Sequence, residues 1–117
     1  MIKILGIDPG SINTGYGIIE SKGNHNKNIE NGVIKVKGKT LAEKLKIINV
    51  EIIKIIEIFK PDEIAIEKVF MHRNADSALK LGQARGAAIT ACAMNDIPLF
   101  EYSANQVKQA CVGKGHA

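Results

Sequence analysis

The chain has 117 residues with a formal net charge of +4, and 45% of them are hydrophobic but only 4% aromatic. This length fits a single domain whose core forms without disulfides, and an Ile, Leu, Val and Ala core is typical of sheets packed with helices. No apolar run reaches the ~18 residues of a membrane helix and no signal peptide is evident, so we expect a cytoplasmic protein with no membrane segment. The modest positive charge suits a phosphate backbone, but on its own it favours ordinary surface solvation over a nucleic-acid partner.

Three strands are predicted near the start of the chain. Lys3 to Asp8 is a short apolar run that ends at Pro9-Gly10, and further runs cover Gly15 to Glu20 and Ile29 to Lys37. The polar stretch between the last two runs, residues 21–28, has turn chemistry, so we expect it to form a hairpin tip.

A long helix is predicted to begin at Thr40. Thr40 and Glu43 have the spacing of a capping box, and Pro61 ends the helix. Apolar residues follow in steps of four and three, which predicts one buried face made of Leu41, Leu45, Ile48, Ile52, Ile55 and Phe59.

Strands and helices alternate in the rest of the chain. We expect a strand over Glu63 to Glu67, a helix from Asn74 or Asp76 to Met94, and a strand over "PLFEY", residues 98–102. A last helix is predicted from Ser103, which forms a capping box with Gln106, to about Gly113. The order strand-strand-strand-helix-strand-helix-strand-helix predicts an α/β fold with a mixed five-stranded sheet and helices on its faces. Cys92 and Cys111 fall in predicted helices, so we expect buried thiols rather than a disulfide or metal pair.

Two carboxylates end two of the predicted strands, Asp8 the first and Glu67 the fourth. If these strands are adjacent and parallel, both side chains reach the same crevice, because ligands bind at the carboxyl ends of parallel strands. At ~5 Å and an effective dielectric near 20 their repulsion would cost about 3 kcal/mol, which a bound Mg²⁺ or Mn²⁺ would reverse. Two such ions can together activate a water and stabilise the leaving oxygen of a phosphodiester.

Other interpretations of these carboxylates remain open. Asp8 before Pro-Gly can simply start a turn, and Glu67 beside Lys68 can be a solvated strand end. The motif "DPGS" also suits a phosphate loop of actin-like kinases and chaperone ATPases, but those proteins need a longer, duplicated chain with further glycine-rich loops.

The segments "ILGIDPGSINTGYGII", "AIEKVFMHRNADSALKLGQARG" and "FEYSANQVKQACVGKG" resemble the RuvC family of Holliday junction resolvases, and the resemblance runs from residue 1 to residue 117. It implies a ribonuclease H-like fold, a homodimer, metal-dependent nicking of four-way DNA junctions during recombination and repair, and a branch-migration helicase as partner. It also implies that Asp8 and Glu67 bind Mg²⁺ or Mn²⁺, two ions per site, as catalytic residues.

The resemblance extends to DNA contacts. Phe70 matches an aromatic residue near the junction crossover, where a ring could stack on an unpaired base, and its structural alternative is packing under the next helix. Lys108 matches a basic residue tied to DNA binding. Arg73, Lys80 and Arg85 could add phosphate contacts by charge alone, while Asn74, Asp76 and Ser77 suit helix capping better than phosphate binding.

Two departures from the family pattern bear on activity. Lys68 stands where the family commonly has Gln, and the family continues past "GKGHA" with a basic residue and a helix that carries further acidic ligands. The prediction is therefore a single ribonuclease H-like nuclease domain over residues 1–117, truncated at its C-terminus relative to the family. A junction-binding module without catalysis and a related nuclease acting on RNA or other structured substrates are the alternatives.

Overall fold

The computed structural model describes residues 1–68 and 74–102. Its elements follow the predicted order through the fifth strand, and the helix predicted from Ser103 lies outside the described residues. They are β1 (Ile2–Asp8), β2 (Asn13–Lys22), β3 (His25–Lys35), α1 (Leu41–Phe59), β4 (Glu63–Glu67), α2 (Ala75–Met94) and β5 (Leu99–Tyr102).

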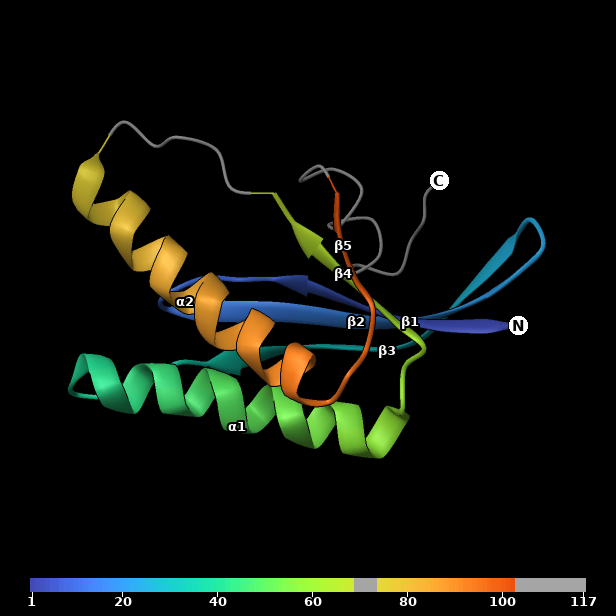
Figure 1. Cartoon of the computed structure of the whole chain (residues 1–117), viewed down its shortest axis with the longest axis horizontal. Helices are drawn as coiled ribbons and strands as arrows, with labels where there is room; N and C mark the ends of the chain where they lie inside the picture. Colours follow the sequence, from blue (N-terminus) through green and yellow to red (C-terminus); the bar gives the residue numbers. More distant parts are fainter. Residues whose placement is uncertain (69–73, 103–117) are drawn as a thin grey trace.

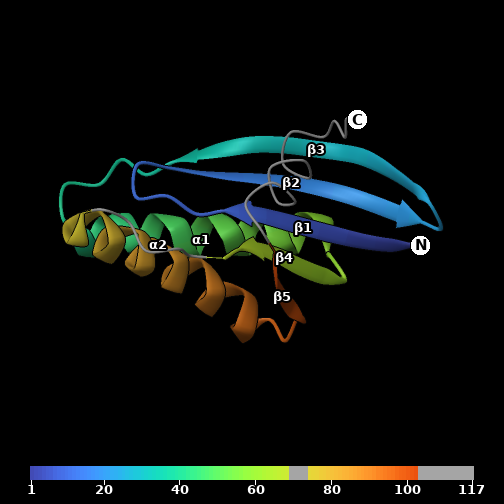
Figure 2. The same ribbon diagram turned by 90° about the horizontal axis from the view of Figure 1, so that it is seen from above.

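The five strands form one mixed sheet in the order β3-β2-β1-β4-β5. β1 and β2 pair antiparallel, as do β2 and β3, whereas β4 is parallel to both β1 and β5. The predicted mixed five-stranded sheet is therefore confirmed. Figure 1 and Figure 2 show that α1 and α2 lie side by side on the same face of this sheet. In the described part of the chain, no helix is both long enough and apolar enough to cross a membrane.

The hairpin between β2 and β3 is tighter than the sequence predicts. Lys22 pairs with His25, so the turn shrinks to Gly23 and Asn24, and most of the predicted tip belongs to the strands. Gly23 has a φ of 59°, a conformation that glycine adopts without a steric penalty and that matches the twist of a two-residue hairpin. The predicted hairpin is confirmed, but its tip is shorter than the polar stretch of residues 21–28, because polar residues on an exposed strand resemble turn residues in composition.

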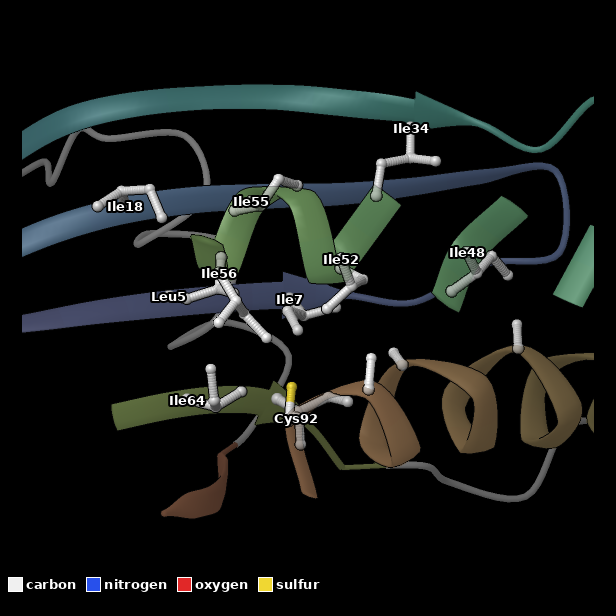
Figure 3. Packing of buried hydrophobic residues seen from close by; sticks show 14 of the residues in the cluster. Leu5, Ile7, Ile18, Ile34, Ile48, Ile52, Ile55, Ile56, Ile64 and Cys92 are labelled. Atoms are coloured by element: carbon white, nitrogen blue, oxygen red, sulfur yellow. The ribbon is translucent and has the colours of Figure 1, made fainter. Parts of the chain in front are cut away.

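The core lies between the helices and the face of the sheet that they cover (Figure 3). Leu5, Ile7, Ile64 and Ile66 contribute fully buried side chains from the two central strands. The isoleucines of α1 meet them at helical spacing, and its buried residues are Ile48, Ile52, Ile55 and Ile56. Leu41, predicted to lie on the buried face, is 52% exposed because it is the first residue of the helix.

Both described helices begin with side-chain caps. Thr40 accepts from the backbone N–H of Glu43, while the Glu43 carboxylate accepts from the N–H of Thr40, which confirms the predicted capping box. Asn74 caps α2 by accepting from the N–H groups of Asp76 and Ser77. These bonds satisfy backbone donors that a helix start leaves unpaired.

Small residues let α2 approach the core closely. Ala84, Ala88 and Ala91 are buried and at most 1% exposed. Gly82 and Gly86 make no such close contact, since a Cβ added to either would meet no atom within 4 Å. Within the chain the tight contact of α2 is thus made by its alanines.

Candidate metal site at the carboxyl edge of the sheet

Asp8 and Glu67 occupy equivalent positions on adjacent parallel strands. Ile7 pairs with Ile66, and each carboxylate is the next residue after this pair. Since side chains alternate along a strand and Ile7 and Ile66 point into the core, Asp8 and Glu67 both project from the face opposite the helices. Neighbouring strands lie ~4.8 Å apart, so the two carboxylates are neighbours at one edge of the sheet. Both residues are partly buried.

The turn after Asp8 is held by the fully buried Thr14. Its hydroxyl donates to the Gly10 carbonyl oxygen at 3.0 Å and accepts from the Gly10 N–H at 3.2 Å. Gly10 is also sterically required, because a Cβ there would lie 2.2 Å from the carbonyl oxygen of Asn13. The turn that follows Asp8 is therefore held in one conformation by the hydrogen bonds between Thr14 and Gly10.

Arg85 supports Glu67 from the other face of the sheet. Its Nε donates to the Glu67 backbone carbonyl at 3.3 Å, and its guanidinium forms an ion pair with Glu101 of β5. The backbone N–H of Lys68 donates to the Tyr102 carbonyl at 2.8 Å and continues the ladder past Glu67. This supporting role was missed by sequence reasoning, which grouped Arg85 with possible phosphate contacts, and the Arg85 side chain is only 16% exposed.

The surroundings of the two carboxylates are built from small residues. Gly15 of β2 lies opposite Asp8. Gly6, two residues before Asp8 on the same strand, lies between Gly17 of β2 and Ala65 of β4. A Cβ on Gly15 would come within 3.8 Å of the Asp8 Cβ. No bulky side chain therefore stands beside Asp8 in these positions, and the closely spaced glycines of "GYG" are the sequence signal for this space.

Two neighbouring carboxylates suit a hard divalent cation. Mg²⁺ is usually bound through one or two carboxylates with the remaining ligands from water and substrate phosphates, so Asp8 and Glu67 fit that chemistry. Across residues 1–68 and 74–102, no group of three or more His, Cys, Asp or Glu side chains is placed to hold a metal ion. Within the described residues, the candidate metal ligands are thus the carboxylates of Asp8 and Glu67.

The structure does not test the three predicted DNA contacts. Phe70, Arg73 and Lys108 fall outside the described residues, so these assignments stay predictions. Lys80, which charge alone suggested as a phosphate contact, forms an ion pair with Asp76 one helical turn away, at 3.1 Å.

The sheet order, the mixed strand directions and the helices place this protein in the ribonuclease H-like class of α/β folds. The chain belongs to the RuvC family, since the family model described as "Crossover junction endodeoxyribonuclease RuvC" matches residues 4–117.

Relatives and solved structures agree with this membership. RuvC of Hahella chejuensis is 55% identical over 117 residues, a match that covers the whole of this chain and 68% of the relative. RuvC of Idiomarina loihiensis is 56% identical over 122 residues with the same coverage of both chains. The structure of T. thermophilus RuvC in complex with Holliday junction substrate is similar with a TM-score of 0.84 and 31% identity, over 100% of this chain and 72% of that one.

Proposed function

We propose that this chain is a structure-specific endonuclease that resolves four-way DNA junctions by metal-dependent phosphodiester hydrolysis, in recombination and repair. The observation that carries the proposal is the position of Asp8 and Glu67 at the ends of adjacent parallel strands, in a chain that belongs to the RuvC family. The residues 1–117 form one nuclease domain in this proposal, and the domain acts in the cytoplasm.

Asp8 and Glu67 are the proposed metal ligands and catalytic residues. They would hold Mg²⁺ or Mn²⁺, two ions per site, which supply charge neutralisation at the phosphate and activation of a water. Asp8 is fixed by the turn that Thr14 holds, and Glu67 by the contact of Arg85 with its backbone. The chain needs no side-chain nucleophile for this reaction, because water attacks the phosphorus.

Phe70, Arg73 and Lys108 are the proposed DNA contacts. Phe70 and Arg73 follow Glu67 within six residues, close enough along the chain to meet DNA bound at the two carboxylates. Stacking on an aromatic ring contributes ~1–3 kcal/mol per base, and a cationic side chain adds a phosphate contact.

We further propose a homodimer and a branch-migration helicase complex as partners. The exposed side of α2 supports the dimer, because Leu79 is 61% exposed and Gly82 and Gly86 on the same side leave room for a close neighbour. Two copies would place two metal sites on one four-way junction, as paired nicking requires.

Cleavage of a synthetic four-way junction tests the catalytic assignment. We expect nicks with Mg²⁺ or Mn²⁺ and none with EDTA, and we expect Asp8→Asn and Glu67→Gln each to lower the rate by at least ~100-fold, the loss typical of an essential electrostatic group. Glu57→Gln is the matched control, since it removes one carboxylate from the exposed surface of α1.

Other outcomes would redirect the assignment. Undiminished cleavage by Asp8→Asn would refute the catalytic role of that residue. Salt-sensitive junction binding with no nicking at any metal concentration would favour a binding module, and preferential cleavage of an RNA–DNA hybrid in competition would exclude the resolvase function.

A further inference from the structure

A group of exposed lysines follows strand β3 and surrounds the start of α1. Lys37, Lys39 and Lys46, here called the lysine surface, line one hollow of about 550 Å³ together with Glu43, Ile47 and Glu51. Residues 35–46 contain five lysines and one glutamate, a local charge of +4 that equals the formal net charge of the whole chain. The remaining residues therefore sum to zero, and this short segment has a strong local excess of positive charge.

The acidic residues beside the lysine surface have partners of their own. The Glu43 carboxylate accepts from the backbone N–H groups of Lys39 and Thr40, at 2.7 and 3.1 Å. Glu51 forms an ion pair with Lys54 at 3.1 Å. Within the described ranges no carboxylate forms an ion pair with Lys37, Lys39 or Lys46. The three lysines are exposed, and their ammonium groups form no ion pair within the described part of the chain.

The backbone that carries these lysines is fixed. The buried Val36 donates its N–H to the Ile12 carbonyl oxygen at 3.0 Å, which ties the end of β3 to the loop that follows Asp8. Gly38 packs on the first turn of α1, where a Cβ would lie 2.8 Å from the Lys44 nitrogen. A surface held in this way can bind a rigid partner without first becoming ordered.

The lysine surface lies beyond the end of β3, at the same end of the sheet as the metal site. Lys46 belongs to α1 on the helix-covered face, whereas Asp8 projects from the opposite face. Asp8, Gly15 and Val33 form one row across β1, β2 and β3, so Val33 lies two strand spacings, ~10 Å, from Asp8. Lys37 and Lys39 follow Val33 by four and six residues, beyond the end of β3. Because duplex DNA carries one charge per ~1.7 Å of its axis, a duplex passing Asp8 would present many phosphates over this span.

We propose that the lysine surface binds the phosphate backbone of a duplex arm of the DNA substrate, on the β3 side of the metal site. This inference rests on the proposed function for the identity of the substrate. The surface makes ion pairs with phosphates and reads no base sequence, so it positions the arm while Asp8 and Glu67 would hold the metal ions beside the reacting phosphate.

The salt dependence of DNA binding tests this assignment. Lys37→Gln/Lys39→Gln removes two charges from the lysine surface, and Lys22→Gln/Lys27→Gln removes two exposed charges near the hairpin at the opposite edge of the sheet. Affinity for a four-way junction and for a linear duplex is measured by fluorescence anisotropy in EDTA, from about 50 to 200 mM salt. Circular dichroism first establishes that both variants remain folded.

We expect the lysine-surface variant to bind both DNAs ~10-fold or more weakly at the lower salt, with the slope of log K against log salt reduced by ~1–2, about 0.9 for each lost phosphate contact. The control variant should retain the slope of the wild type. Equal slopes for the two variants, or a loss confined to the junction and absent on the linear duplex, would overturn the proposal. EDTA prevents metal-dependent cleavage during the measurement. The binding result can therefore be interpreted even if the nuclease assignment proves wrong.

Discussion

Ile7 of β1 and Ile66 of β4 lie opposite each other in adjacent parallel strands, and both side chains are completely buried. This apolar pair fixes the register in which Asp8 and Glu67 follow. A slip of one residue would expose the isoleucines and turn a carboxylate into the core, at a cost of several kcal/mol for an unpaired buried charge. The core of the protein therefore enforces the proximity of its two strand-end acids.

This proximity predicts that a divalent metal stabilises the protein. In EDTA, Asp8→Asn should have a free energy of unfolding equal to or above that of the wild type, because it removes a repulsion between like charges. With Mg²⁺ or Mn²⁺ at a hundredfold excess over its Kd, the wild type should gain ~2.7 kcal/mol and Asp8→Asn much less. Thermal denaturation with and without metal measures both effects, and Glu57→Gln should behave as the wild type. Equal metal-induced gains in wild type and Asp8→Asn would exclude Asp8 as a ligand.

The two strand-end carboxylates could be predicted because their determinants are local: the strand ends at Asp8 and Glu67 follow from short apolar runs. The sequence analysis assumed the adjacency of the two strands only as a condition, and the pairing of β1 with β4 meets that condition. The support by Arg85 was not predictable, since the contact joins residues 18 positions apart through the packing of α2 on the sheet. The lysine surface does not show in the small formal net charge of the whole chain, because acids elsewhere offset part of the positive charge, whereas residues 35–46 alone carry +4.

Removing Arg85 should weaken the metal site and the fold together. Arg85→Met removes the hydrogen bond to the Glu67 backbone and the ion pair with Glu101, so we expect a loss of ~1–2 kcal/mol in unfolding free energy. The metal-induced gain in stability should also fall, because Glu67 loses its backbone support. Lys80→Gln breaks only an exposed ion pair within α2 and should cost no more than ~0.5 kcal/mol. An unchanged response to metal in Arg85→Met would limit Arg85 to a structural role.

The two sides of α2 should respond in opposite ways to a larger residue. Ala88 is completely buried, so Ala88→Leu should overpack the core and cost ~1–3 kcal/mol. Gly86→Ala adds a Cβ that meets no atom within 4 Å, so helix propensity should stabilise the monomer by up to ~1 kcal/mol. Urea denaturation of dilute protein compares the two variants. Destabilisation by Gly86→Ala that grows with protein concentration would place the glycine in a dimer contact.

Cys92 should be inert toward alkylation in the native protein. The side chain is completely buried, and burial raises the pKa of its thiol to about 12, so the reactive thiolate is scarce near neutral pH. In a Cys111→Ser background Cys92 is the only thiol. Iodoacetamide should modify it only after unfolding, as followed by mass spectrometry across a urea series. Rapid modification without denaturant would contradict its burial.

The capping box of α1 should give the stability of the protein a characteristic pH dependence. Hydrogen bonds from the backbone N–H groups of Lys39 and Thr40 hold the pKa of the Glu43 carboxyl below its ordinary value of 4.5. Since the folded pKa is lower than the unfolded one, Glu43 stabilises the protein above the unfolded value, and this contribution is lost as the pH falls through the folded value. The stability difference between wild type and Glu43→Gln should therefore shrink in acid.

Thr40→Ala should cost ~1 kcal/mol with little pH dependence of its own, because it removes the hydroxyl acceptor. Chemical denaturation at neutral pH and at pH values below 4.5 separates the two, and a Glu43→Gln difference that persists in acid would show that its effect is not due to ionisation.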